Sequence, residues 1–212
     1  AVRLLAAIVP AAVTLTSGSK TREYNGSALT NEEVEGKNEN GLTVETGWVG
    51  SEGATYKFTG TITEAGTVKN AFTYELKDGT IASNYTITKT EGDLTIEAST
   101  AKITVVPGSG SKTYDGTALT KTAHDDFTVT GVPEGFTWTA AADGTVTNVV
   151  PGSGEKAENA VTEFKIFNAA GDDVTAQFAD IDTSAKGTPT IPPAAAGAAA
   201  WSPVAGTFAM QS

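Results

Sequence analysis

The chain of 212 residues carries a formal net charge of −11 and contains no cysteine. Such a charge implies an acidic surface, which repels phosphate backbones and argues against nucleic acid as a partner. The absence of cysteine excludes disulfides, thiolate metal sites and cysteine nucleophiles. A hydrophobic content of 39% is enough for a core, and the 23 glycines favour strands and turns over helices.

Residues 1–11 form an apolar extension whose charged side chain is Arg3. The stretch is similar to the core of a signal peptide, yet it is too short to cross a bilayer, which takes roughly 20 apolar residues. We therefore expect no membrane span and the start of an already processed chain. If the extension is a strand, one face carries the candidate subunit contacts Val2, Leu4, Ala6 and Ile8.

A sequence repeat occupies most of the remaining chain. The segment Tyr24–Thr30 (YNGSALT) returns as Tyr114–Thr120 (YDGTALT). Weaker matches follow in the same order: Gly47-Trp48-Val49 with Glu52-Gly53 and Gly131-Val132 with Glu134-Gly135, Asn70–Thr73 and Asn159–Thr162, and Glu91–Ile96 and Lys186–Ile191. These ordered matches predict a duplication, with repeat 1 at residues 12–99 and repeat 2 at 100–191. Each copy has about 90 residues, a usual size for a domain, and the linker near Ala98-Ser99-Thr100 is short.

Large and polar side chains alternate along short segments of both repeats, as expected for strands with one buried face. Examples are Tyr56–Ile62, Phe72–Leu76, Phe127–Val129, Phe136–Trp138 and Phe164–Ile166. Asn-Gly and Asp-Gly pairs, which suit tight turns, separate such segments at 25–26, 78–79, 115–116 and 143–144. The sequence therefore predicts an all-β fold of two tandem β-sandwich modules.

A family resemblance rests on Lys112–Thr120, the Gly-hydrophobic-Pro-Glu-Gly segment at 131–135 and the Lys-Gly-Thr-x-Thr-Ile segment at 186–191. These segments resemble the tandem β repeats of bacterial surface proteins, especially Gram-positive ones, including MBG-type adhesin modules. The resemblance implies Ig-like modules and an extracellular location at the cell surface, and it carries over no catalytic residue. Repeat 1 departs from the pattern, with Arg22-Glu23 inserted before its tyrosine.

Residues 192–212 form a second apolar extension, which is rich in alanine and uncharged. Trp201 is a candidate anchor for a pocket on another subunit, and Val204, Phe208 and Met210 share one face if this stretch is a strand. An exposed apolar strand can be covered by adding it to the sheet of a neighbouring copy, and head-to-tail exchange of this kind builds a filament. The alternatives are that both extensions pack on their own repeats or are disordered.

No group of residues predicts a catalytic, cofactor or metal site. His124 is expected in an exposed loop, without the nucleophile and orienting acid that a catalytic triad needs. The paired acids are expected to be solvated, with weak calcium binding as the alternative. These pairs are Asp125-Asp126, Asp172-Asp173, and Asp180 with Asp182.

Each of the remaining candidates has a structural and a functional interpretation. Trp48 and Trp138 are expected to pack in the cores, with stacking against sugars as the alternative. A lysine–asparagine cross-link through Asn70 or Asn84 is considered, but no distinctive motif accompanies it.

These patterns predict a non-enzymatic extracellular structural protein without a cofactor. It is expected to be a subunit of a surface fibre or pilus-like filament, with copies of itself as partners. The alternative is an adhesin or stalk fragment that binds a host glycan or protein through its loops.

Overall fold

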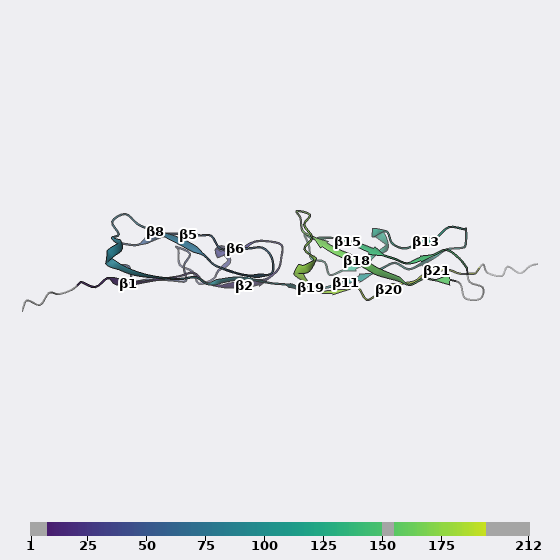
Figure 1. Cartoon of the computed structure of the whole chain (residues 1–212), viewed down its shortest axis with the longest axis horizontal. Coiled ribbons are helices and arrows are strands. Elements are labelled where there is room, and N and C mark those ends of the chain that lie inside the picture. Colours follow the sequence, from purple (N-terminus) through teal and green to yellow (C-terminus); the bar gives the residue numbers. More distant parts are fainter. Residues whose placement is uncertain (1–7, 150–154, 194–212) are drawn as a thin grey trace, which may run out of the picture. The chain divides into compact units, whose positions relative to one another are not determined.

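The computed structural model describes residues 8–149 and 155–193, and the chain is all-β (Figure 1). Within these ranges four short 3₁₀ helices accompany the strands. No helix of the described residues is long and apolar enough to cross a membrane. The first half contains β1 (Ala11–Thr16), β2 (Lys20–Glu23), β3 (Leu29–Thr30), η1 (Asn31–Glu33), β4 (Val44–Thr46), β5 (Ala54–Phe58), β6 (Thr61–Ile62), β7 (Gly66–Lys69), β8 (Phe72–Leu76), η2 (Ala82–Asn84), β9 (Tyr85–Thr90) and β10 (Asp93–Glu97).

The second half repeats this order of elements, with β20 as an additional short strand. It contains β11 (Ser99–Val106), β12 (Gly110–Ser111), β13 (Leu119–Thr120), η3 (His124–Asp126), β14 (Thr128–Thr130), β15 (Thr137–Ala142), β16 (Thr145–Val146), β17 (Glu155–Lys156), β18 (Asn159–Phe167), η4 (Thr175–Gln177), β19 (Phe178–Asp182), β20 (Lys186–Gly187) and β21 (Pro189–Ile191). Ala98 alone separates β10 from β11, so the expected linker is largely strand.

The strand pairing also recurs. In the first half β1 lies between β4, to which it is antiparallel, and β9, to which it is parallel. In the second half β11 lies between β14, to which it is antiparallel, and β19. Likewise, β10 lies between β2 and β7, and β21 lies between β12 and β17. The duplication seen in the sequence therefore extends to the order of strands in each sheet.

Contacts divide the described chain into two compact units. Unit 1 comprises residues 8–102, 132–137 and 166–181, and unit 2 comprises 103–131, 138–149, 155–165 and 182–193. The units thus differ from the two sequence repeats, because two short segments of repeat 2 pack with repeat 1. Those segments carry Phe136, Phe178 and Gln177, whose contacts are described below.

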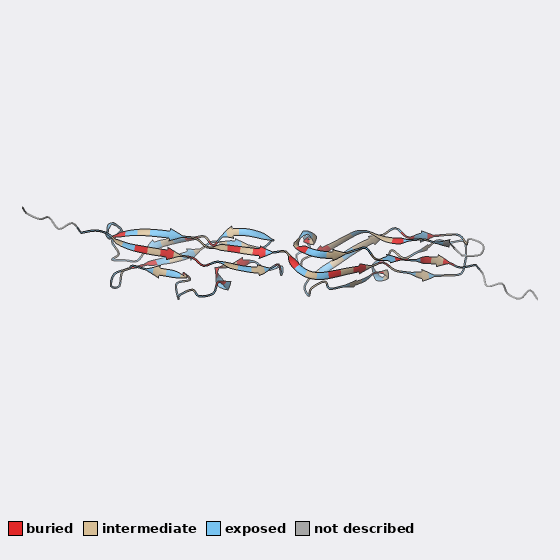
Figure 2. Ribbon diagram, turned by 90° about the horizontal axis from the view of Figure 1, so that it is seen from below, coloured by how far each residue is buried: buried red, intermediate tan, exposed pale blue. Residues whose placement is uncertain are grey.

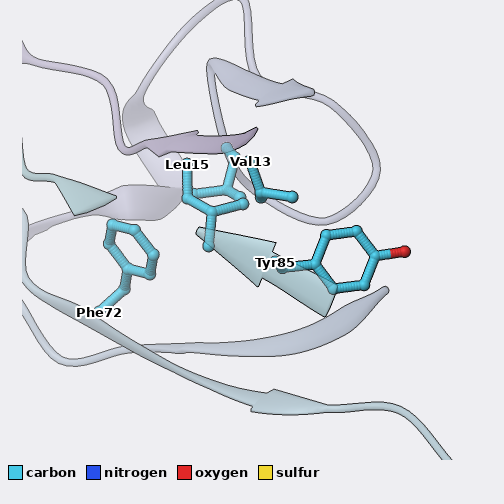
Figure 3. Packing of buried hydrophobic residues seen from close by; sticks show 5 residues of the cluster. Val13, Leu15, Phe72 and Tyr85 are labelled. Atoms are coloured by element: carbon cyan, nitrogen blue, oxygen red, sulfur yellow. The ribbon is translucent and has the colours of Figure 1, made fainter. Parts of the chain in front are cut away.

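The core of unit 1 forms between two layers of strands. Val13 and Leu15 of β1 and Tyr85 of β9 face Phe72 of β8, and Leu42 completes the cluster (Figure 3). Aromatic side chains of the β5–β8 pair, Tyr56, Phe58 and Tyr74, pack against it. Along β1 and β10 buried residues alternate with intermediate or exposed ones (Figure 2). This arrangement is consistent with a β-sandwich.

Unit 2 buries a similar set of aliphatic residues on equivalent strands. Ile103 and Val105 of β11, Val146 of β16 and Ile191 of β21 are at most 1% exposed. The β11 residues occupy the places of Val13 and Leu15 in the repeated strand order. Period-2 patterns in the sequence therefore identified real buried faces in both halves.

The turn that both repeats share, before β3 and β13, corrects one expectation from the sequence. In repeat 2 the Nζ of Lys112 donates to Oδ1 of Asp115 at 2.8 Å, and in repeat 1 Nη1 of Arg22 donates to Oδ1 of Asn25 at 2.6 Å. Arg22 therefore occupies the place of Lys112 and is not an insertion. Both cationic side chains donate a hydrogen bond to the side-chain oxygen of the residue at which the turn begins.

Candidate functional site

The terminal candidates lie mostly outside the described residues. The candidates outside the described residues are Val2, Leu4, Ala6, Trp201, Val204, Phe208 and Met210. Ile8 is described, and it is 98% exposed. Ala11, the last residue of the expected extension, already belongs to β1, where it pairs with Tyr85.

Four exposed apolar side chains of unit 1 belong to segments that lead into β1 or β9 or that hydrogen-bond to Tyr85. Ile8, Val9, Val49 and Ile81 are 57–98% exposed. The amide of Val49 donates to the Tyr85 hydroxyl at 3.2 Å, and the carbonyl of Ile81 accepts from the residue before Tyr85. A groove next to them is lined by Ile8, Val9, Pro10, Ala11, Ser83 and Asn84. We call the four exposed residues around Tyr85 the Tyr85 rim.

The rim rests on a firmly held tyrosine. Tyr85 is 8% exposed, and its ring packs edge-on against Trp48 at 4.9 Å between centroids. Its hydroxyl points away from the other labelled core side chains (Figure 3) and donates to the carboxylate of Glu52. That hydrogen bond raises the pKa of Tyr85 above its usual value, with burial adding to the effect. Tyr85 is therefore held by a ring contact and by hydrogen bonds to Glu52 and to the amide of Val49.

A second aromatic cluster in unit 1 surrounds Tyr24, which is 6% exposed. The Tyr24 ring lies 5.8 Å from that of Phe136 and 5.9 Å from that of Phe178, and the latter two are 5.3 Å apart. Beside them Oε1 of Gln177 accepts from the amide of Ala65 at 2.7 Å. Burial raises the pKa of Tyr24, and nearby acidic charges raise it further.

The counterpart of Tyr24 in repeat 2 is Tyr114, which is 54% exposed. Its loop has the same backbone: Gly26 and Gly116 both have φ +82. Asn25 accepts from the amide of Ser27 at 3.0 Å, and Asp115 accepts from the amide of Thr117 at 2.9 Å. Hydrogen bonds from Lys112 and Thr117 hold the pKa of Asp115 well below its usual range. The sequence repeat could locate both loops, but it gave no sign that one is covered and the other open.

A polar network on unit 1 joins Trp48 and Tyr56 to Glu45. The carboxylate of Glu45 accepts hydrogen bonds from the Tyr56 hydroxyl at 2.6 Å and from the side-chain amides of Asn38 and Asn40 at 2.7 and 2.8 Å. Nε1 of Trp48 donates to the Tyr56 hydroxyl at 3.3 Å. Burial alone would raise the pKa of Glu45, but these hydrogen bonds outweigh it and lower that pKa. The network holds the half-buried rings of Trp48 and Tyr56 next to the Glu45 carboxylate and the exposed Asn38 and Asn40.

Trp48 and Trp138 are both half-buried. Trp48 packs against the core of unit 1, as expected. Trp138 stacks on the exposed ring of His124, with centroids 4.1 Å apart. His124 thus lies on the surface against an aromatic face.

The paired acids are engaged separately by neighbouring groups. Asp126 accepts a hydrogen bond from Lys121 at 2.9 Å. Asp173 accepts one from the Thr175 hydroxyl at 2.6 Å, and Asp172 accepts one from the side-chain amide of Asn168 at 3.1 Å. Across the described residues no three His, Cys, Asp or Glu side chains come together as metal ligands.

Asn70 and Asn84 lie in different environments. Asn70 is fully buried and donates to the carbonyl of Gly18 and to Oδ1 of Asn31. The Nζ of Lys37 approaches the same region, but it donates to the backbone carbonyls of Asn31 and Glu32. Asn84 is exposed in η2. These contacts give Asn70 a structural role in holding two loops together.

Comparisons with family models, with curated proteins and with solved structures found no match to this chain. Its function must therefore be argued from its own surfaces.

Proposed function

We propose that this chain is a non-enzymatic extracellular structural protein of a bacterial surface, built from two tandem Ig-like β-sandwich modules. Copies join head to tail through strand exchange by the extensions at residues 1–11 and 192–212. The product is a fibre or pilus-like filament.

The module assignment is supported by the recurrence of the strand order. The β4-β1-β9 sheet has its counterpart in β14-β11-β19, and the β2-β10-β7 sheet has its counterpart in β12-β21-β17. In unit 1 the β5–β8 pair supplies a second layer over the β1 side chains. Sequential short strands in two layers are the features of an Ig-like sandwich.

The observation that carries the assembly proposal is the Tyr85 rim. Ile8 and Val9 lead directly into β1 with 98% and 80% of their surface exposed, beside the exposed Val49 and Ile81. Apolar surface in water costs about 25 cal/mol per Å², so a cluster of such side chains favours association. The N-terminal extension includes Ile8 and Val9 of this rim, which supports a contact between copies that uses both.

A second candidate function rests on the Glu45 network. Trp48 and Tyr56 offer aromatic surface beside a carboxylate and the amides of Asn38 and Asn40. Aromatic faces next to convergent polar groups suit the apolar and hydroxylated faces of a sugar. An adhesin would use this surface to bind a host glycan. A glycan array probed with wild-type protein and with Trp48→Ala tests it: signals lost in the variant support an adhesin.

Deletion of residues 1–10 tests the filament. The truncated chain keeps all of β1 and is expected to retain its circular dichroism spectrum while losing association in size-exclusion chromatography and filaments in negative-stain microscopy. Deletion of residues 194–212 is the matched control for the opposite extension. Each deletion leaves one exchange partner intact, so mixing the two truncated chains is expected to give dimers and no longer species. Unchanged association after both deletions would refute strand exchange.

A further inference from the structure

Tyr24 and Tyr114 lie in two loops of the same conformation with very different surroundings. The glycines of the two turns, Gly26 and Gly116, both have φ +82. In each loop the side-chain oxygen of the residue before the glycine accepts a hydrogen bond from the backbone amide of the residue after it. Tyr24 is 6% exposed and Tyr114 is 54% exposed. The loop therefore does not need a cover in order to keep its shape.

The cover over the Tyr24 loop comes from two connections of repeat 2. Phe136 lies in the connection between β14 and β15, and Phe178 begins β19 directly after η4. A Cβ added to Gly26 would lie 3.0 Å from the Phe136 ring, whereas a Cβ added to Gly116 would meet nothing within 4 Å. The Tyr114 loop thus has the same backbone shape, but among the described residues no atom approaches its glycine as Phe136 approaches Gly26.

The corresponding connections of repeat 1 supply two residues of the Tyr85 rim, Val49 and Ile81; Ile8 and Val9 come from the segment before β1. Val49 lies between β4 and β5, and Ile81 lies between β8 and β9, just before η2. They are 60% and 57% exposed. Tyr85, which begins β9, takes the place that Phe178 takes at the start of β19. Hence the connections that cover Tyr24 have counterparts that carry exposed apolar side chains, Val49 and Ile81, whereas Tyr85 itself is already packed against Trp48.

We propose that Tyr114 of one copy docks on the Tyr85 rim of a second copy, using the connections of repeat 1 that correspond to those covering Tyr24 within the chain. The inference rests on the proposed self-assembly and adds a defined pair of surfaces to it. The two surfaces differ from each other, so the contact is heterologous and leaves one of each free at every step. Repetition of the contact extends a head-to-tail array.

The contact between chains is weaker than its counterpart within the chain. Covalent linkage supplies an effective concentration on the order of millimolar for short connections. Separate chains lack that advantage, and a surface set by a few apolar side chains gives a modest affinity. Association is therefore expected between about 10 μM and about 1 mM of protein.

Analytical ultracentrifugation of the full chain over this range tests the docking. The variants are Tyr114→Ser on the loop and the double change Val49→Ser, Ile81→Ser on the rim. Val44→Ser is the matched control, because Val44 is also exposed, at 39%, but lies on β4 opposite Thr16 and away from the rim. All of these side chains are exposed, so every variant is expected to keep the wild-type circular dichroism spectrum.

The sedimentation coefficient of wild type and of Val44→Ser should rise with concentration, and that of each docking variant should stay at the monomer value. An equimolar mixture of the loop and rim variants retains one intact surface of each kind, so it should form dimers and stop there. Wild-type protein that stays monomeric throughout, or a Tyr114→Ser variant that associates like wild type, would overturn the inference. If Tyr114→Ser associates normally while deletion of residues 1–10 abolishes association, strand exchange stands and this docking is wrong.

Discussion

Nδ2 of Asn70 donates a hydrogen bond of 2.9 Å to the carbonyl oxygen of Gly18, across the start of β8 and the end of β1. Repeat 2 contains the same bond: Nδ2 of Asn159 donates to the carbonyl of Gly108 at 3.0 Å. Both asparagines are fully buried. Because a buried carbonyl without a partner is costly, this bond fixes where the chain leaves the first strand in each half.

Replacing Asn70 by alanine is expected to lower the free energy of unfolding by about 1–3 kcal/mol, since it leaves buried acceptors on Gly18 and Asn31 without their donor. Urea titration followed by tryptophan fluorescence measures the loss. Asn84→Ala, at an exposed position in η2, is the control and should change stability by less than about 0.5 kcal/mol. Equal effects of the two substitutions would contradict a structural role for the buried amide.

Gly92 lies against the same crossing and is expected not to tolerate a side chain. A Cβ at this position would lie 2.4 Å from the Gly18 carbonyl oxygen, which is backbone and can move only with the strand. Gly92→Ala should therefore destabilise the fold by about 1–3 kcal/mol through overpacking.

Gly53 provides the matched control for that substitution. A Cβ there would meet the Lys77 side chain at 3.6 Å, an ordinary contact distance. Gly53→Ala is expected to stabilise slightly or to have no effect, because it reduces the freedom of the unfolded chain. Thermal unfolding of both variants compares them. A Gly92→Ala protein as stable as Gly53→Ala would show that the crossing is looser than described.

The sequence alone was sufficient for much of the fold. The alternating segment Phe72–Leu76 matches β8, and the repeated motif at Tyr24 and Tyr114 identified two loops with the same turn. Such features depend on neighbours close in sequence, which is why period and turn chemistry reveal them.

Other features escaped because they depend on partners far away in the sequence. Phe136–Trp138 has an alternating pattern, yet β15 begins at Thr137, and Phe136 instead packs against Tyr24. Nothing near Tyr24 or Tyr114 distinguishes the buried ring from the exposed one. The Glu45 network is closer in sequence, but it depends on how the loop with Asn38 and Asn40 folds back onto β4 and on Tyr56 of the next strand, which no local pattern reveals.

Acid should weaken the fold partly through Glu45. Its folded-state pKa lies below the usual 4.5, so the ionised carboxylate stabilises the folded state above that value. This contribution is lost as the pH falls through the lowered folded pKa. The free energy of unfolding, measured by urea titration at about pH 6 and about pH 3, should drop more for wild type than for Glu45→Gln. An equal drop in both proteins would mean that Glu45 is not hydrogen-bonded as described.

Tyr24 and Tyr114 provide a matched pair for stability, because the same residue type stands in the same loop in two environments. Tyr24→Ala removes a buried ring from its contacts with Phe136 and Phe178, which should cost about 3 kcal/mol of unfolding free energy. Tyr114→Ala removes a ring that is 54% exposed and should cost less than about 0.5 kcal/mol in dilute protein.

Differential scanning calorimetry at low and high protein concentration separates the two roles of these rings. Tyr24→Ala should lower the melting temperature equally at both concentrations, because its partners lie in the same chain. Tyr114→Ala should match wild type in dilute solution and fall below it in concentrated solution, where docking between copies stabilises the wild type by mass action. If Tyr114→Ala follows wild type at both concentrations, Tyr114 takes no part in association. If Tyr24→Ala is as stable as wild type, the Tyr24 cluster does not form in solution.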